Sequence, residues 1–188
     1  MRKVVLLIHV SLDGFVAGPN GELEWIVAEG KVHDHVQRRI DQVDTAIYGR
    51  VTYELMESYW PAVPGNPEST PADIKHANWY LKAQKIVFSR TLGAVERPNT
   101  RVIAANIREE IMALKEQPGG DLMIFGSPSI AQEFMRLRLI DEYRIQINPI
   151  VLGEGIPLFK DVTNRFGLTL VETTPFESGV VALHYEQG

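Results

Sequence analysis

The chain contains no cysteine, and this absence excludes three kinds of chemistry. A disulfide framework, a thiolate nucleophile and a metal site built on thiolates all need that residue. Long hydrophobic runs are missing as well, since no apolar stretch approaches the roughly 20 residues that cross a bilayer. Positive charge is scarce, because 19 Lys and Arg stand against 24 Asp and Glu, for a formal net charge of -5. We therefore expect neither a nucleic-acid partner nor a membrane partner.

The residues that are present are typical of one soluble domain. Of the 188 residues, 45% are hydrophobic and 23% are charged, which suffices for a real core. The N-terminal residues do not match the pattern of a signal peptide, because the apolar run before His9 has only five residues and no cleavage motif follows it. We expect a single domain over residues 1–188, located in the cytoplasm.

Strand-like and helix-like segments alternate along the chain. The patterns predict strands at 3–11, 44–49, 85–89, 100–104, 121–125 and 141–150, helices at 32–42, 51–58, 72–82 and 106–116 and after 128, and a terminal pair at 168–174 and 179–185. The Pro- and Gly-rich stretch 60–71 predicts a surface loop. Such alternation ending in a hairpin predicts a three-layer α/β fold with a mostly parallel central sheet and an antiparallel C-terminal edge.

The most informative segment is 121–134, which reads as a buried strand, a tight Gly-Ser-Pro-Ser turn and a helix. Gly126 leaves room for a ligand beside the backbone, and Pro128 suits a first helical turn. Unpaired N–H groups at such a helix start bind anions, with phosphate the first candidate. An ordinary capped helix after a strand would show the same residues.

Two other strand ends carry polar residues, in the segments Gly-Arg-Val-Thr at 49–52 and Ser-Arg-Thr at 89–91. Ligands of open α/β sheets collect beyond the carboxyl ends of the strands, where arginines and hydroxyls would form a phosphate cradle. Taken singly, Arg50 and Arg90 are better explained as solvated surface residues. Trp25, after a Gly-rich loop, is either a wall for a flat ring or a tryptophan at the core edge.

Together these motifs resemble the reductase domain of riboflavin biosynthesis, which shares the dihydrofolate reductase fold. The N-terminal part of the resemblance is Ser11-Leu12-Asp13-Gly14, Gly21, Trp25-Ile26, the strand from Asp44 to Gly49, and Thr52. The C-terminal part is Leu139-Ile140-Asp141-Glu142, then Pro149 to Gly155 and Leu158-Phe159. Segments 49–52, 89–90 and 125–127 also look like the nucleotide-binding strand ends of dihydrofolate reductases. The resemblance covers nearly the whole chain and is closest to the stand-alone branch described as dihydrofolate reductase-like.

The resemblance implies NADPH as cofactor and hydride delivery to a C=N or C=O carbon of a small ring or opened sugar. The substrate would be a ribosylamino-pyrimidine, as for 5-amino-6-(5-phosphoribosylamino)uracil reductase, or a pterin. By position, the implied cofactor residues are Val10, Val16 and Ala17 at the nicotinamide; Gly49, Arg50, Val51 and Thr52 at pyrophosphate and ribose; Ser89 and Arg90 at the 2′-phosphate; and Phe125, Gly126, Ser127, Ser129 and Ile130 on the other side of the pyrophosphate. Trp25, Leu152 and Gly153 would line the substrate pocket. A homodimer is also implied, paired through sheet edges, with the apolar terminal strand 180–183 in need of cover.

The substrate residues depart from the family pattern. Leu23 and Val27 stand where the riboflavin enzymes carry Ser and Thr around the tryptophan. The segment after Thr52 lacks the family's Asp-Asn-Pro and Arg, which help bind a ribose-phosphate. Asp34 lies near the acidic residue of true dihydrofolate reductases, but its spacing from Trp25 is too long. An NADP(H)-binding module without turnover is therefore the alternative to an enzyme.

Reduction of a C=N bond also needs a proton, and two carboxylates lie near the implied nicotinamide. Asp13 precedes a glycine at a turn, so capping that turn explains it well. Glu24 has apolar neighbours that would raise its pKa by desolvation, although a solvated loop carboxylate is equally consistent. No metal site is expected, because His33 and His35 are two residues apart and point to different sides of a helix. Neither a Gly-x-Ser-x-Gly elbow nor a Walker A loop occurs.

Overall fold

In the computed structural model, which describes residues 1–93, 95–97, 99–162 and 165–188, strands and helices alternate as expected. The strands are β1 (Val4–Val10), β2 (Phe15–Ala17), β3 (Val43–Gly49), β4 (Gln84–Phe88), β5 (Thr100–Ile103), β6 (Asp121–Phe125), β7 (Glu142–Ile147), β8 (Ile156–Pro157), β9 (Leu168–Pro175) and β10 (Val181–Gln187). The helices are α1 (Gly30–Ile40), α2 (Arg50–Tyr59), α3 (Pro71–Lys82), α4 (Ile107–Glu116) and α5 (Pro128–Arg136), with a 3₁₀ helix, η1, at Trp60–Gly65.

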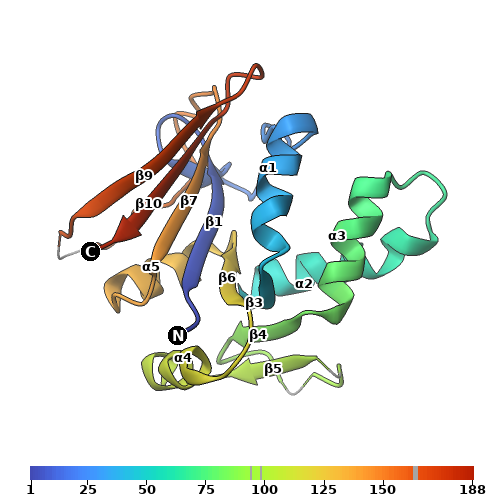
Figure 1. Ribbon diagram of the computed structural model, residues 1–188, viewed down its shortest axis with the longest axis vertical. Helices are drawn as coiled ribbons and strands as arrows, with labels where there is room; N and C mark the ends of the chain where they lie inside the picture. Colours follow the sequence, from blue (N-terminus) through green and yellow to red (C-terminus); the bar gives the residue numbers. More distant parts are fainter. Residues whose placement is uncertain (94, 98, 163–164) are drawn as a thin grey trace.

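Eight of these strands form one sheet in the order β5-β4-β3-β6-β1-β7-β10-β9. Neighbours pair in parallel from β5 to β7, and the last two strands pair antiparallel (Figure 1). The expected parallel sheet with an antiparallel C-terminal edge is therefore confirmed. Its parallel strands end at one common edge, where ligands of such sheets bind.

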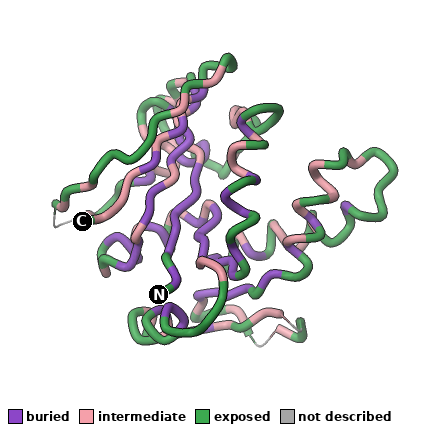
Figure 2. Tube along the Cα trace, in the orientation of Figure 1, coloured by how far each residue is buried: buried purple, intermediate pink, exposed green. Residues whose placement is uncertain are grey.

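Alternation along β1 divides the core into two layers. Val4, Leu6 and Ile8 point to one face and pack with residues of α4 and α5. Val5 and Leu7 point to the other face, among residues of α1, α2 and α3. Because successive strand residues face opposite sides, a strand covered on both faces is apolar throughout, and β1 is such a strand: most of its residues are buried, as Figure 2 shows for the central strands. The three-layer arrangement follows from this double covering.

Three local expectations were wrong. The stretch predicted as a loop from residue 60 begins with η1, because its prolines hold φ in the helical range. The strand predicted at 141–150 ends at Ile147, where the buried Asn148 turns its side chain to the backbone of Val27 and Gln146. A small second sheet, β2 with β8, was not expected, since strands of two or three residues show no periodicity.

The terminal strand is also not the exposed edge that its composition suggested. β10 lies between β7 and β9, so Val180 and Ala182 are buried. The edge is β9, whose Leu170 and Val171 are each 52% exposed. In the part of the chain that the structure describes, none of the helices combines the length and apolar character needed to cross a membrane.

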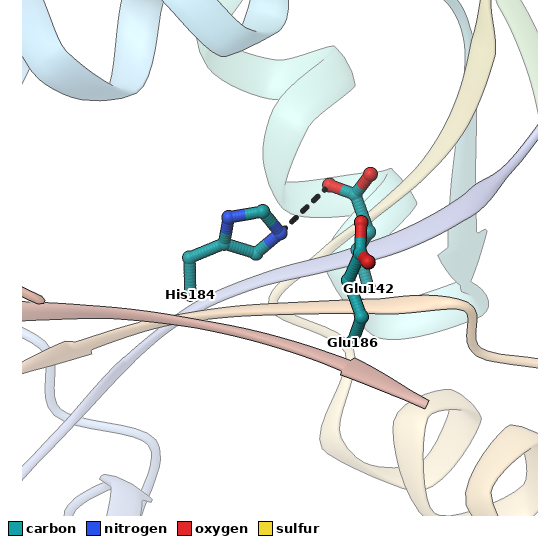
Figure 3. Close-up of side chains that lie close together, drawn as sticks. All are labelled: Glu142, His184 and Glu186. Carbon is teal, nitrogen blue, oxygen red and sulfur yellow. Dashed lines mark ion pairs between the residues drawn. The ribbon is translucent and has the colours of Figure 1, made fainter. Parts of the chain in front are cut away.

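A network of charges lies at the opposite end of the sheet from the strand-end edge. Glu142, at the start of β7, is 5% exposed and lies beside His184 and Glu186 of β10 (Figure 3). The ammonium of Lys3 contacts both carboxylates, at 2.7 Å from Glu142 and 3.0 Å from Glu186. Arg144 lies 3.3 Å from Glu142. Although the His and two Glu could together ligate a cation, the lysine ammonium already bridges the carboxylates, and ion pairing accounts for the cluster.

Candidate active site

A cavity of about 1070 Å³ opens at the carboxyl ends of the parallel strands. Four strands of the parallel sheet bring residues to its wall: His9 from β1, Gly49 from β3, Phe88 from β4 and Phe125 from β6. From this edge the cavity extends over both faces of the sheet. One half is formed by the starts of α2 and α5, and the other by α1, α3 and the far end of α2.

In the first half, two helices begin at the cavity without side-chain caps. α2 starts after Gly49 and α5 after Ser127, and neither N-cap residue makes a side-chain hydrogen bond to its helix. Instead, the Ser127 hydroxyl accepts a hydrogen bond from the Gly49 N–H at 3.1 Å, which ties the two turns together. Backbone N–H groups at two adjacent helix starts are thus left for an anionic ligand.

The turn before α5 has an unusual backbone. Gly126 and Ser127 both lie in the left-handed region, with φ of 57° and 48°. A serine there costs on the order of 1 kcal/mol, and such conformations cluster at ligand sites. A Cβ on Gly126 would meet only the Thr52 Cγ2, at 3.9 Å. The missing side chain therefore leaves open space in the cavity wall.

Gly49 lacks a side chain for a different reason. A Cβ there would lie 3.1 Å from Cγ1 of Ile130 on α5. This contact is closer than ordinary van der Waals packing, so the glycine lets α5 approach β3. Of the two glycines, only Gly126 leaves room for a ligand.

Most of the cofactor residues implied by sequence meet at this cavity. Those that line it are Val16, Ala17, Gly49, Arg50, Val51, Thr52, Phe125, Gly126, Ser127, Ser129 and Ile130. Val10, Ser89 and Arg90 are not among the lining residues. Ser89 uses its hydroxyl in the turn after β4, where it accepts hydrogen bonds from the N–H groups of Thr91 and Leu92. Arg90 is exposed and lies two residues beyond Phe88, which does line the cavity.

The implied substrate and proton residues lie elsewhere. Trp25, Leu152, Gly153, Glu24 and Asp13 are all absent from the cavity wall. The indole N–H of Trp25 donates to the Glu22 carbonyl at 3.1 Å, and its neighbours Leu23 and Ile26 face the cavity instead. The Glu24 side chain is exposed, so its apolar neighbours do not bury it.

Asp13 joins two loops. Its carboxylate accepts hydrogen bonds from the backbone N–H groups of Leu152, at 3.1 Å, and Gly153, at 2.8 Å. The Ser11 hydroxyl donates a third bond at 2.6 Å, and these contacts lower the pKa of Asp13 below its ordinary value. The residue thus holds the loop after β7 against the turn after β1.

Three histidines line the cavity, and sequence reasoning placed none of His9, His33 and His76 there. Burial lowers the pKa of His9 to about 4, and its Nδ1 lies 3.4 Å from the side-chain amide of Asn148. Burial also lowers the pKa of His76 to about 4; its ring packs on Trp60 at a centroid distance of 4.3 Å. Both rings are therefore neutral at pH 7. The position of His9 at the end of a buried strand was a usable signal, whereas a lone histidine on α3 offered none.

The sheet order and the cavity at the strand ends are those of the dihydrofolate reductase fold. The chain belongs to the RibD C-terminal domain family, whose model matches residues 2–182. A dihydrofolate reductase is among the solved structures that share its fold.

Comparisons with individual proteins agree with the family and the fold. The chain is 38% identical over 186 residues to the uncharacterized protein YyaP of Bacillus subtilis (strain 168), covering 98% of this chain and 94% of YyaP. A pyrimidine reductase-like protein from Corynebacterium diphtheriae superposes with a TM-score of 0.71 at 16% identity, covering 100% of this chain and 92% of the other. Dihydrofolate reductase from Enterococcus faecalis, solved with NADP(H) and RAB-propyl, gives 0.65 at 18% identity, covering 99% and 96%.

Proposed function

We propose that the protein is an NADPH-dependent reductase of a small heterocyclic substrate, of the ribosylamino-pyrimidine or pterin type. The observation that carries the proposal is the pair of uncapped helix starts, at Arg50 and Pro128, that face one strand-end cavity. Such N–H groups suit a pyrophosphate, and the E. faecalis dihydrofolate reductase of like fold was solved with NADP(H). Steady loss of NADPH absorbance with a pterin or pyrimidine substrate is the test.

In this reaction NADPH would supply a hydride to a C=N or C=O carbon of a small ring or opened sugar, and a proton would have to reach the adjacent nitrogen or oxygen. The residues of the chain hold the reactants and exclude water. Val16 and Ala17, in β2, would flank the nicotinamide, and Thr52 and Ser129 would bind phosphate oxygens at the two helix starts. His9, held neutral by burial, contributes no charge to the wall.

Arg90→Ala is expected to weaken NADPH binding by about 10- to 100-fold and NADH binding much less, because a charge-assisted bond to the 2′-phosphate would be lost. Fluorescence titration with both cofactors measures this. Arg50→Ala is the comparison: Arg50 is implied at the pyrophosphate and ribose, which both cofactors share, and is paired with Glu54 at 2.8 Å, so any loss there should be equal for NADPH and NADH. If Arg90→Ala weakens the binding of NADPH and NADH equally, the assignment of Arg90 to the 2′-phosphate is wrong.

We propose Glu24 as the proton donor, and its substitution distinguishes this role from proton donation by a bound water. Glu24→Gln should lower turnover about 100-fold, in the range of general-acid catalysis, and leave NADPH affinity intact. Asp13→Asn serves as the comparison, because the Asp13 carboxylate binds the backbone amides of Leu152 and Gly153 in the loop after β7. Unchanged turnover on a genuine substrate would identify a bound water as the proton source.

A second candidate function is an NADP(H)-binding module without turnover. The observation that favours it is that neither proposed carboxylate, Glu24 or Asp13, lines the cavity. Such a module would bind NADPH but oxidise none with pterin, flavin-pathway or carbonyl compounds. Any steady turnover with one of these excludes it.

We also propose a homodimer in the cytoplasm, a location that the cysteine-free composition fits. The exposed edge strand β9, with Leu170 and Val171 on its surface, is the segment we expect a second copy to cover. Light scattering at micromolar concentration should then give twice the chain mass of 21.2 kDa. A single-chain mass would count against the dimer.

A further inference from the structure

The second half of the cavity, which we call the helix arm, has a composition unlike that of the first. It lies between α1, the far end of α2, and α3. Its wall includes Val32, Val36, Gln37, Leu55, Trp60 and His76. Aliphatic side chains of α1 and α2 thus face an aromatic pair, in which Trp60 and His76 are packed at 4.3 Å. An apolar site with an aromatic wall suits a flat ring.

The helix arm offers no cation to an anionic group. Among the described residues that line the whole cavity, the Lys and Arg side chains are those of Arg50 and Lys160. Arg50 begins α2 beside the turn of α5 and is paired with Glu54. Lys160 follows β8, which Gln132 of α5 holds by a hydrogen bond to Pro157. Both cations therefore belong to the other half of the cavity.

The other titratable residues of the helix arm do not supply a positive charge either. Asp73 lines the arm, but its carboxylate accepts hydrogen bonds from the backbone and hydroxyl of Thr70 in the capping box of α3. His33 lies 3.7 Å from Asp34, and His76 is held neutral by burial. A phosphate placed here would lose its hydration without gaining a partner, which is costly.

A chain of hydrogen bonds fixes which nitrogen of His76 carries the proton. Lys75 contacts Asp41 at 2.7 Å, and this bond, followed by that of Gln37, holds the pKa of Asp41 below its ordinary value. The ionised carboxylate can only accept, so the amide nitrogen of Gln37 faces it, at 2.9 Å. The amide oxygen of Gln37 is then the atom 3.4 Å from Nδ1 of His76. Since that oxygen also only accepts, Nδ1 bears the hydrogen and Nε2 is an acceptor.

We propose that the helix arm binds a flat, uncharged ring that donates an N–H hydrogen bond to Nε2 of His76. This deepens the proposed reductase function and rests on it, because the ring in this arm would be the group that receives the hydride. The apolar wall offers no partner to a phosphate placed in the arm, and the Lys75–Asp41–Gln37 chain keeps His76 in the acceptor form. Gln37 and His76 are thus residues that determine substrate specificity.

Three probes that share one ring test the proposal: quinazolin-4(3H)-one, its N3-methyl derivative, and its 7-carboxylate. Dissociation constants are measured by NMR titration of the full chain, with and without NADP⁺. The neutral N–H probe should bind about 10-fold more tightly than the N-methyl probe, as loss of one hydrogen bond predicts. It should also bind at least about 10-fold more tightly than the carboxylate, which would be buried without a cation.

Variants assign the discrimination to the arm. His76→Phe keeps an aromatic ring but removes the hydrogen-bond acceptor. The difference in dissociation constant between the N–H and N-methyl probes, the affinity gap, should therefore vanish. The matched control is His35→Phe, since His35 packs against Phe176 and does not line the cavity; the gap should persist there. Gln37→Leu, which frees the His76 tautomer, should narrow the gap and serves if His76→Phe does not fold.

Three outcomes would overturn the proposal: equal or tighter binding of the carboxylate, a gap that survives His76→Phe, or no binding of the neutral ring at millimolar concentration. NADP⁺ binding is followed on the same samples. If the protein discriminates between the ring probes but does not bind NADP⁺, the proposed cofactor is rejected and the proposed ring site stands. NADP⁺ binding without discrimination would reject the ring site alone.

Discussion

Gly126→Ala is expected to weaken NADPH binding by about 100-fold while the chain still folds. The added methyl group would meet little of the protein, because the Thr52 Cγ2, at 3.9 Å, is the one atom within 4 Å of its position. It would instead enter the space between the starts of α2 and α5, where we propose the pyrophosphate binds. Isothermal titration with NADPH measures the loss.

Gly14→Ala is the matched control for this prediction. Gly14 also has a left-handed φ, of 88°, and a Cβ there would meet nothing within 4 Å. Gly14 does not line the cavity. Both variants should lose on the order of 1 kcal/mol of stability from backbone strain, visible in thermal unfolding. If the two variants lose NADPH affinity equally, strain explains the effect and the pyrophosphate site is elsewhere.

The first half of the cavity was predictable from sequence because its signals are local. The segments at 49–52 and 125–130 each carry strand end, turn and helix start within a few residues. Parallel strands then bring such ends to one edge whatever their separation in sequence. The structural reason for each individual residue was harder to predict from the sequence. Gly49 and Gly126 look alike in sequence, yet Gly49 makes room for Ile130, whereas Gly126 leaves open space in the cavity wall.

The helix arm could not be predicted, because packing of distant helices creates it. Gln37 and His76 lie 39 residues apart, on α1 and α3, and meet only when both helices cover the same face of the sheet. Asp13 shows the same limit. Its position at a turn suggested a cap, but the amides that it binds are 139 and 140 residues away. Periodicity and turn chemistry describe neighbours in sequence, and such contacts depend on the assembled fold.

The largest effect on stability is expected at the other end of the sheet, from Glu142→Gln. Glu142 is buried and lies within 3.6 Å of three cations, Lys3, Arg39 and Arg144. They come from the start of β1, from α1 and from β7, so one carboxylate joins three parts of the fold. Removing its charge leaves cations close together and partly buried, which should cost about 3 kcal/mol of unfolding free energy. Urea denaturation at pH 7 measures this cost.

Glu186→Gln is the control for that substitution. Glu186 contacts the same ammonium of Lys3, at 3.0 Å, but its side chain is 43% exposed. Exposed ion pairs are screened by water, so this variant should lose less than about 1 kcal/mol. Equal losses for the two variants would contradict the special role of the buried carboxylate.

The dependence of stability on pH provides an independent measure of the same interaction. Burial by itself raises the pKa of Glu142, but the hydrogen bond from Lys3 and the charges of Arg39 and Arg144 outweigh burial and lower it below its ordinary value. A carboxyl group whose pKa is lowered on folding stabilises the protein above its unfolded pKa, about 4.3 for Glu. That contribution disappears as the pH falls through the lower, folded value. Between pH 7 and the acid range, the wild-type chain should therefore lose its stability advantage over Glu142→Gln, so that the two unfolding free energies converge. If the difference stays constant down to acid pH, the cost of the substitution is one of packing and not of charge.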